Sequence, residues 1–310
     1  MTKRIIILTM AVLAVAEMSA QQDAMFTHYM HNTLAVNPAY AGSRDAMTTT
    51  LLHRNQWVSI EGAPKTNTLT IHSPVFRENL GFGFSVVNER VGPINNTALT
   101  LDFAYSLQVT KDAKLGFGLK AGANMMSGNL TELAIGEEQD VAFEQNMSSD
   151  VLPNFGFGLY YHSDRYYVGL STPKIIENDF RNMASHDGGQ KRHYFLIAGT
   201  VVDLSENIRF KPTTFLKITQ GAPLQADLTS TFIFNDKFNL GAMYRTDDAI
   251  GALLGVNINP QLYFGYSFDW AYRSDWNVVE NAVQRTSHEV MLRYDMIFKG
   301  EDKIRSSRFF

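Results

Sequence analysis

Large apolar residues alternate with small or polar ones along most of the chain, in rows that run from Thr48 to Phe298. Residues two apart on a β-strand lie on the same face of the sheet, so this period predicts strands. Most rows fit the roughly nine to eleven residues that a membrane-spanning strand needs, which exceeds the about five or six usual in soluble domains. The pattern predicts about fourteen strands, at 46–56, 65–75, 80–90, 96–109, 113–128, 153–163, 165–172, 192–203, 208–219, 223–235, 238–246, 249–259, 261–272 and 286–298.

The two faces of these predicted strands differ in the size of their residues. In LGFGFSV, residues 80–86, the leucine, the phenylalanines and the valine share one face, while the glycines and the serine share the other. LGFGLKAG at 115–122 and FGFGLYYH at 155–162 repeat this scheme. A membrane barrel with lipid outside and a polar interior has such faces. A soluble β-sandwich produces the same alternation, so the period alone leaves both architectures open.

The lengths of the connections separate the two architectures. Every second connection is brief, with the sequences FREN, TKDA, SDR, LSEN, NDK and NPQ, whereas the long ones, at 129–152, 173–191 and 273–285, all fall at odd positions. Short turns at one end and long loops at the other are typical of outer-membrane barrels. The sequence therefore predicts an all-β fold, a transmembrane outer-membrane β-barrel of about 14 antiparallel strands. An even strand number places both termini at the short-turn end, in the periplasm.

Aromatic residues near the predicted strand ends are candidates for the girdles that mark the two membrane interfaces. They are Tyr160, Tyr161, Tyr166, Tyr167, Trp270 and Tyr272.

The first twenty residues have the layout of a secretory signal peptide. Lys3 and Arg4 precede an apolar run at 5–16, and the small residues Ser19 and Ala20 follow it. Such a run is too short to span a bilayer as a helix. The chain contains no cysteine, so it has neither a disulfide framework nor thiolate chemistry.

The segment between the signal peptide and the first strand has a different period. Phe26, Tyr29, Met30 and Leu34 fall at helical spacing, and Asp23 is a candidate N-cap. Pro38 and Gly42 then interrupt this pattern, because proline disfavours helix at the preceding residue and glycine tolerates a left-handed turn. We expect an amphipathic plug in the barrel mouth, joined to the wall by a hinge at 38–42. The resulting layout is a signal peptide at 1–20, a periplasmic or plug segment at 21–45, the barrel at 46–298 and a periplasmic tail at 299–310.

Composition excludes some functions and supplies little chemistry. The net charge of −4 and the absence of a basic cluster argue against nucleic-acid binding. His28 and His31 lack an evident third metal ligand, and the acidic residues of the 129–152 loop lack calcium-loop spacing. No nucleophile motif is present. The sequence therefore predicts no enzyme, no cofactor and no metal site, and it places Arg54, Arg293 and Asp295 on interior positions, paired across the lumen.

Two stretches, YMHNTLAVNPAYAGS and HRNQWVSIEGAPKTNTLTIHSPV, resemble the opening of the PorP/SprF membrane proteins of the type IX secretion system of Bacteroidota. The match rests on the candidate motif residues Asn37, Pro38, Ala39, Tyr40, Gly42, Arg54, Gln56, Trp57, Gly62 and Pro64, with Ala41, Ala63 and Thr66. The resemblance implies a non-enzymatic outer-membrane barrel that assists export or surface attachment of secreted adhesins through their C-terminal domains. It also implies contact with the periplasmic ring proteins and, for some members, a link to gliding motility. As an outer-membrane barrel, the protein is also expected to contact outer-membrane lipid.

Two other functions remain open from the sequence. The first is an outer-membrane porin or hydrophobic-solute channel, which steady, large conductance in planar bilayers would reveal. The second is a membrane hydrolase, whose activity a single Ser, His or Asp substitution would abolish. The plug-like segment and the glycine-rich inner faces argue against a wide pore, since small inner side chains leave room for an inserted element.

Overall fold

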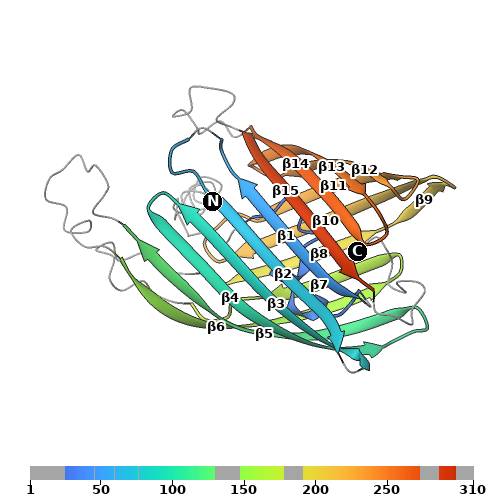
Figure 1. Ribbon diagram of the computed structural model, residues 1–310, viewed down its shortest axis with the longest axis horizontal. Helices are drawn as coiled ribbons and strands as arrows, with labels where there is room; N and C mark the ends of the chain where they lie inside the picture. The colour runs from blue at the N-terminus through green and yellow to red at the C-terminus, as the bar shows by residue number, and fades with distance from the viewer. Residues whose placement is uncertain are drawn as a thin grey trace, which may run out of the picture.

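The computed structural model describes residues 25–44, 46–58, 60–75, 77–129, 147–177, 191–272 and 286–297. One antiparallel sheet curves round and closes on itself, because the first strand pairs with the last, with Met47 opposite Met296 (Figure 1). The strands are β1 (Met47–Asn55), β2 (Lys65–Val75), β3 (Arg77–Val91), β4 (Ile94–Gln108), β5 (Ala113–Gly128), β6 (Met147–Ser163), β7 (Tyr166–Thr172), β8 (His193–Thr200), β9 (Val202–Ser205), β10 (Ile208–Thr219), β11 (Gln225–Phe234), β12 (Phe238–Arg245), β13 (Ala249–Asn257), β14 (Leu262–Ala271) and β15 (Thr286–Met296).

The wall contains fourteen strands, as the sequence predicts, because β8 and β9 form one of them. Both pair with the same side of β10, and only Val201 separates them. The predicted segment at 192–203 covers both pieces. The largest differences in boundary are at the starts of β3 and β6, which begin at Arg77 and Met147. Most of the residues added at these two starts are polar and carry no regular apolar alternation, but pairing with the neighbouring strand extends both strands.

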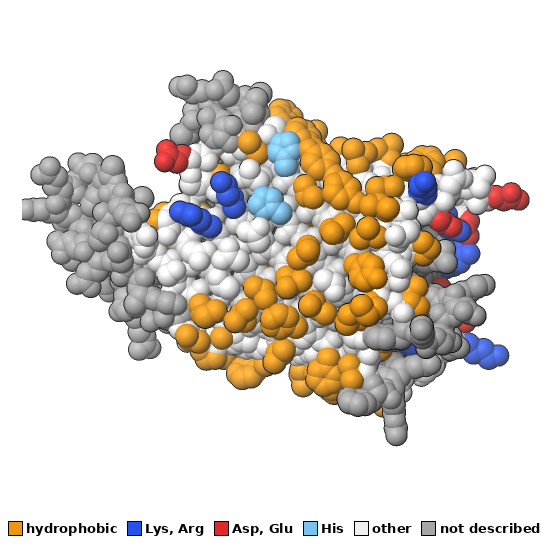
Figure 2. Space-filling model, in the orientation of Figure 1, with side chains coloured by type: hydrophobic (Ala, Val, Ile, Leu, Met, Phe, Trp, Pro, Cys, Tyr) orange, Lys and Arg blue, Asp and Glu red, His pale blue; other side chains and the backbone are white. Residues whose placement is uncertain are grey.

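The outer and inner faces of the wall have the predicted composition. Phe82 and Leu119 point outward and are 49% and 59% exposed, whereas Asp102 points inward and is 1% exposed. Figure 2 shows hydrophobic side chains over much of the outer face, with charged ones toward its two ends. This arrangement suits lipid outside and a polar lumen.

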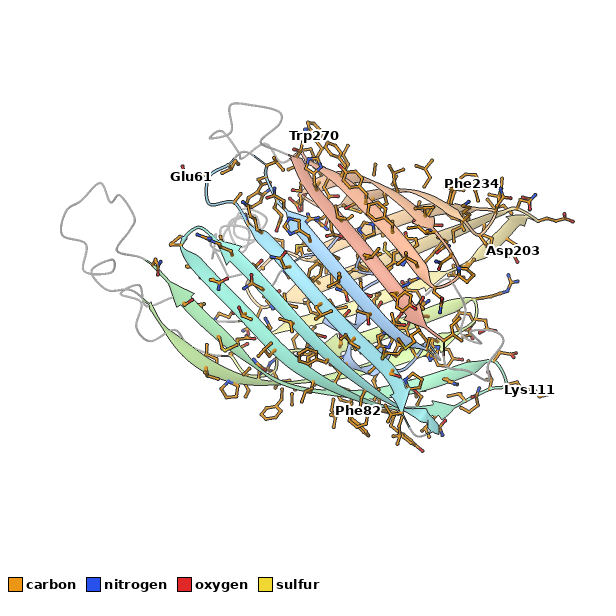
Figure 3. All side chains as sticks on the ribbon, in the orientation of Figure 1. Glu61, Phe82, Lys111, Asp203, Phe234 and Trp270 are labelled. Atoms are coloured by element: carbon orange, nitrogen blue, oxygen red, sulfur yellow. The ribbon has the colours of Figure 1, made fainter. Side chains whose placement is uncertain are left out.

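The long loops all lie at one end of the barrel, and the connections at the other end are short turns. Lys111 and Phe234 mark the end with short turns, and Glu61 lies at the end with long connections (Figure 3). We call these the short-turn end and the long-loop end. The strand boundaries confirm the predicted sorting, because the connections at 129–146, 173–192 and 272–285 all leave the long-loop end.

The predicted aromatic girdle is wrong for two of its tyrosines. Tyr160 and Tyr167 point into the lumen and are buried, whereas Tyr161 and Tyr166 lie outside with their rings 5.9 Å apart. Consecutive residues of a strand point to opposite faces, so only one member of each tyrosine pair can face the membrane. Trp270 is on the outer face, as expected.

Residues 25–44 lie inside the barrel, and we call them the inner segment. Its helical parts in the structure are α2 (Thr33–Val36) and the 3₁₀ turn η1 (Pro38–Tyr40). Within the described residues, no helix is both long and apolar enough to cross a membrane. Tyr29, Leu34 and Tyr40 form a buried core with wall residues such as Ile197 and Phe215. The barrel therefore has a packed interior, built from the inner segment and the inward faces of the strands.

Candidate functional site

The inner segment spans the lumen: it starts near the long-loop end and finishes at the short-turn end. Its last residues precede β1, which starts at the short-turn end, and Thr27 reaches Asp269 near the long-loop end of β14. Only one α-helical turn forms, although the spacing of Phe26, Tyr29 and Met30 predicts a longer helix. Several of its backbone and side-chain groups bond to the wall instead. Irregular backbone at membrane depth is tolerated where protein surrounds it.

A buried carboxylate holds the start of the inner segment. Glu289 Oε1 accepts the backbone N–H of His28 at 2.7 Å and its ring Nδ1 at 2.7 Å, and Oε2 accepts the N–H of Thr27 at 2.9 Å. Arg54 Nη1 lies 3.3 Å from the same carboxylate and 2.8 Å from Asp269 Oδ2, which also accepts the hydroxyl of Thr27. We call these five residues the Glu289 anchor. Because Glu289 is 0% exposed, these partners replace the water that it loses.

The middle of the inner segment is fixed by one tyrosine. The hydroxyl of Tyr29 lies 3.1 Å from Thr213 Oγ1 and 3.4 Å from Thr229 Oγ1, on β10 and β11. Its ring stacks on Phe215 at a centroid distance of 4.9 Å. On the facing wall, Lys120 Nζ donates to the carbonyl of Leu34 at 3.3 Å. Opposite sides of the barrel thus hold the same short stretch.

Glycines of the inner wall admit the backbone around η1. A Cβ built on Gly118 would overlap the backbone of Ala39, and one on Gly158 would overlap the side chain of Asn37. Asn37 also caps η1, since its Oδ1 accepts the N–H of Ala39 at 2.9 Å while its Nδ2 donates to the carbonyl of Leu159 at 2.9 Å. The glycine-rich faces of β5 and β6 therefore form a slot shaped to this turn.

The expected hinge at Pro38–Gly42 is wrong in its position. Pro38 starts η1, and residues 38–41 are buried in the lumen rather than lying between a plug and the wall. Gly42 has the left-handed φ of 72° that its sequence context predicts, and its N–H donates to His72 Nδ1 at 3.1 Å. Its backbone approaches Gly81 so closely that a Cβ would lie 2.6 Å from the Gly81 Cα. The break is a turn inside the barrel, and the wall begins only at Met47.

Buried ion pairs line the rest of the lumen. Arg54, Arg293 and Asp295 occupy interior positions, as the sequence predicts, but they pair with nearby strands and with the inner segment rather than across the lumen. Asp295 Oδ2 lies 3.0 Å from Arg44 Nη2 and 3.4 Å from Arg293 Nε. Three carboxylates were not singled out as sites by the sequence, although each falls on an inward-facing position of an alternating strand. They are Glu289 and Asp269 of the Glu289 anchor and Asp227, which Arg245 contacts with Nε and Nη2 at 2.8–3.0 Å.

The two histidines of the inner segment have separate partners. The Nδ1 of His28 donates to Glu289, whereas His31 stacks on Tyr263 at 4.8 Å and its Nδ1 accepts from Arg293 Nη1 at 3.3 Å. Burial, with the cations Lys211 and Arg293 nearby, lowers the pKa of His31 well below its usual value. Among the described residues, no three His, Asp or Glu side chains are grouped as metal ligands would be. The acidic loop considered for calcium lies largely outside the described residues.

A family model described as "Type IX secretion system membrane protein PorP/SprF" matches residues 18–294. The chain belongs to this family. Membership and the barrel fold place the protein in the outer membrane, as a component of the type IX secretion system. The family is one of secretion membrane proteins and is not a known class of enzyme. A search of curated proteins gave no match.

Two solved outer-membrane barrels align with most of this chain. CymD, described as a monoaromatic hydrocarbon channel, aligns with a TM-score of 0.50 at 11% identity, over 86% of this chain and 92% of its own. Omp33 of Acinetobacter baumannii aligns with a TM-score of 0.48 at 8% identity, over 82% of this chain and 100% of its own. Identities this low concern the fold alone.

The PorP/SprF motif residues divide into two groups in the structure. Asn37, Pro38, Ala39, Tyr40, Gly42 and Arg54 lie in the lumen, whereas Gln56, Trp57, Gly62 and Pro64 form the β1–β2 connection at the long-loop end. In this connection Gln56 N donates to Pro64 O at 3.0 Å, and Gly62 O accepts from Gly92 N at 2.7 Å. Trp57 has a left-handed φ of 46°, and its N–H donates to Ser287 Oγ at 3.2 Å.

Within the lumen group, Tyr40 is a packing residue. Its ring meets Tyr160 edge-on at 5.4 Å and His72 at 5.1 Å, and it is buried. The lumen group thus seats the inner segment, and the second group shapes the rim.

Proposed function

We propose that this PorP/SprF protein assists the export or surface anchoring of secreted adhesin-like proteins, by binding them or their C-terminal domains. One observation carries the proposal beyond family membership: the inner segment occupies the middle of the lumen, where both the Glu289 anchor and the glycines around η1 hold it. A barrel without an open pore suits a docking component better than a diffusion channel. A role in gliding motility, through such an adhesin, belongs to the same proposal.

The alternative function is that of a porin or hydrophobic-solute channel. CymD, which shares the fold, is described as a monoaromatic hydrocarbon channel. The packed inner segment argues against free diffusion through this lumen, since Tyr29 and Leu34 occupy its middle. Steady, large conductance of the wild-type barrel in planar bilayers would favour the channel.

The proposed orientation puts the long-loop end outside the cell and the short-turn end in the periplasm. The wall begins at Met47 and finishes at Met296. These two residues pair with each other, so both lie at the same end of the barrel, which is the short-turn end. The tail at 299–310 then faces the periplasmic ring proteins, which we propose as its partners. The first described residues of the inner segment lie in the long-loop half of the lumen. The path of residues 21–24, outside the described part, would therefore decide whether the N-terminus is periplasmic.

Single cysteines should report this orientation without background, because the natural chain has none. In intact cells, a membrane-impermeant maleimide should label the Glu61→Cys variant. The Lys111→Cys variant should react only after the outer membrane is opened, because Lys111 lies on a turn at the opposite end (Figure 3). Labelling of the Lys111→Cys variant alone in intact cells would invert the topology.

Removing the protein should leave adhesin cargo inside the cell, measured as the loss of surface adhesin by antibody labelling. Deleting residues 300–310 alone should lower surface display while the barrel still assembles, seen as heat-modifiable migration on a gel. The tail is rich in charge, with Glu301, Asp302 and Lys303 in sequence, which suits a soluble or lipoprotein partner. Wild-type display after the tail deletion would exclude a role for the tail, and normal display in cells lacking the whole protein would refute the proposed function.

A further inference from the structure

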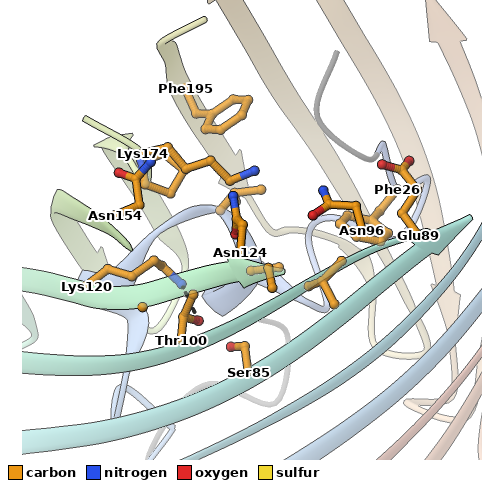
Figure 4. A pocket seen from close by; sticks show the side chains of 16 residues that line it. Phe26, Ser85, Glu89, Asn96, Thr100, Lys120, Asn124, Asn154, Lys174 and Phe195 are labelled. Atoms are coloured by element: carbon orange, nitrogen blue, oxygen red, sulfur yellow. Dashed lines mark hydrogen bonds between the residues drawn. The ribbon is translucent and has the colours of Figure 1, made fainter. Parts of the chain in front are cut away.

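A cavity lies between the inner segment and the wall, in the long-loop half of the lumen (Figure 4). Its volume is about 90 Å³. Phe26 and Val36 of the inner segment form one side, and Val87, Ala98 and Phe195 of the strands add apolar surface. The polar lining comes from Ser85, Glu89, Asn96, Thr100, Lys120, Asn124, Asn154 and Lys174. The space, which we call the cup, therefore combines apolar surface with eight polar side chains, as ligand sites do.

A folded-in segment completes the edge of this cup. After β7, residues 173–176 continue along the inner side of β6, where Asn154 holds them. Asn154 Oδ1 accepts the N–H groups of Ile175 and Ile176 at 3.0 and 3.1 Å, and its Nδ2 donates to the carbonyl of Ile176 at 2.9 Å. Gly156 makes room, since a Cβ there would lie 2.5 Å from the carbonyl oxygen of Pro173. The cup is thus a built feature, with Lys174 at its edge.

Three polar side chains of the cup have atoms without a hydrogen-bond partner. They are Nδ2 of Asn124, Oγ of Ser85 and Oδ1 of Asn96, on neighbouring strands β5, β3 and β4. Asn124 and Ser85 are each only 2% exposed. Figure 4 shows Asn124 and Asn96 turned toward the same space, with Phe195 across from them. Buried polar groups normally have partners, so an unmatched donor and an unmatched acceptor on adjacent strands can both bond to a ligand in this space.

We propose that this cup binds one apolar side chain of an extended polypeptide, together with the peptide groups on either side of it. A peptide group offers a carbonyl that can accept from Asn124 Nδ2 and an N–H that can donate to Asn96 Oδ1. The apolar surface of Phe26, Val36 and Phe195 suits the side chain between them. The choice of a polypeptide rests on the proposed export function, whereas the place and the polar pattern rest on the geometry of the cup.

The test uses the purified full-length barrel and the capped tripeptide acetyl-Ala-Phe-Ala-amide, with affinity measured by titration calorimetry. The tripeptide should bind to the wild-type barrel. The Asn124→Leu variant should bind it about tenfold more weakly, because the change keeps similar volume but removes one buried hydrogen-bonding group. Ser267→Ala is the matched control: this serine is equally buried and unpartnered but lies on β14, away from the cup, so affinity should not change.

Several results would overturn the inference. They are no binding of the tripeptide at millimolar concentration, equal binding by Asn124→Leu and wild type, or binding of glucose in place of the tripeptide. Toluene binding that displaces the tripeptide and ignores Asn124→Leu would assign the cup to apolar solutes. If Asn124→Leu does not fold, as judged by heat-modifiable migration, Ser85→Ala replaces it, with a weaker affinity expected in the same direction. The two proposals can fail separately. If the tripeptide does not bind but cells that lack the protein still fail to display the adhesin, the cup is refuted and the export role is not.

Discussion

Replacing Glu289 with leucine should lower the free energy of unfolding of the barrel by about 3–5 kcal/mol, as expected when one partner of a buried charge pair is removed. The carboxylate accepts hydrogen bonds from Thr27, His28 and Arg54 and is 0% exposed. Leucine of similar size would leave two backbone N–H groups without partners and Arg54 with Asp269 alone. The start of the inner segment should then detach from the wall.

Urea unfolding in lipid vesicles, followed by the fluorescence of the three tryptophans, measures this loss. Glu289→Gln should cost less, because its amide oxygen still accepts a hydrogen bond while the charge is lost. Val290→Leu is the matched control, since the neighbouring side chain points to the lipid and the change keeps it apolar. A Glu289→Leu variant as stable as this control would mean that the anchor contributes little to folding.

Replacing Gly118 with valine should turn a closed barrel into a conducting one. Any Cβ at this position overlaps the backbone of Ala39, and backbone cannot be displaced as the end of a flexible side chain can. Valine itself suits a strand, so β5 should persist while η1 leaves its slot. Single-channel recording in planar bilayers should show steady openings that the wild-type barrel lacks.

Two further variants make this conductance result decisive. Gly241→Ala is the control, because the three atoms nearest to a Cβ on that inner-wall glycine belong to β11 and β13 rather than to the inner segment, and it should stay closed. Deleting residues 21–36 removes most of the inner segment and should open the barrel as Gly118→Val does. If the deletion variant assembles and conducts no more than wild type, the inner segment is not what closes the lumen.

The strands and their faces could be predicted because they depend on local chemistry. A strand that separates lipid from a polar lumen must alternate its side chains, so LGFGLKAG at 115–122 reveals both the strand and its outward face. Tyr160 and Tyr161 cannot both belong to the predicted aromatic girdle. They are consecutive residues of one strand, so one of them must point inward. The strand starts at Arg77 and Met147 were missed because these stretches do not alternate regularly and are strands only through pairing with β2 and β5.

The sequence by itself determined the number of wall strands, the sorting of short and long connections, and the inward positions of Arg54, Arg293 and Asp295. Only the tertiary structure decided which groups meet in the lumen. Glu289 is separated from His28 by 261 positions, and no local period reports such a pairing. The same holds for Pro38–Gly42: the sequence marks a break, but whether it is a hinge or a turn inside the barrel depends on Gly81 and Gly118 across the lumen. Periodicity records the environment on each side of a strand, whereas contacts across the lumen depend on the closure of the barrel and on its register.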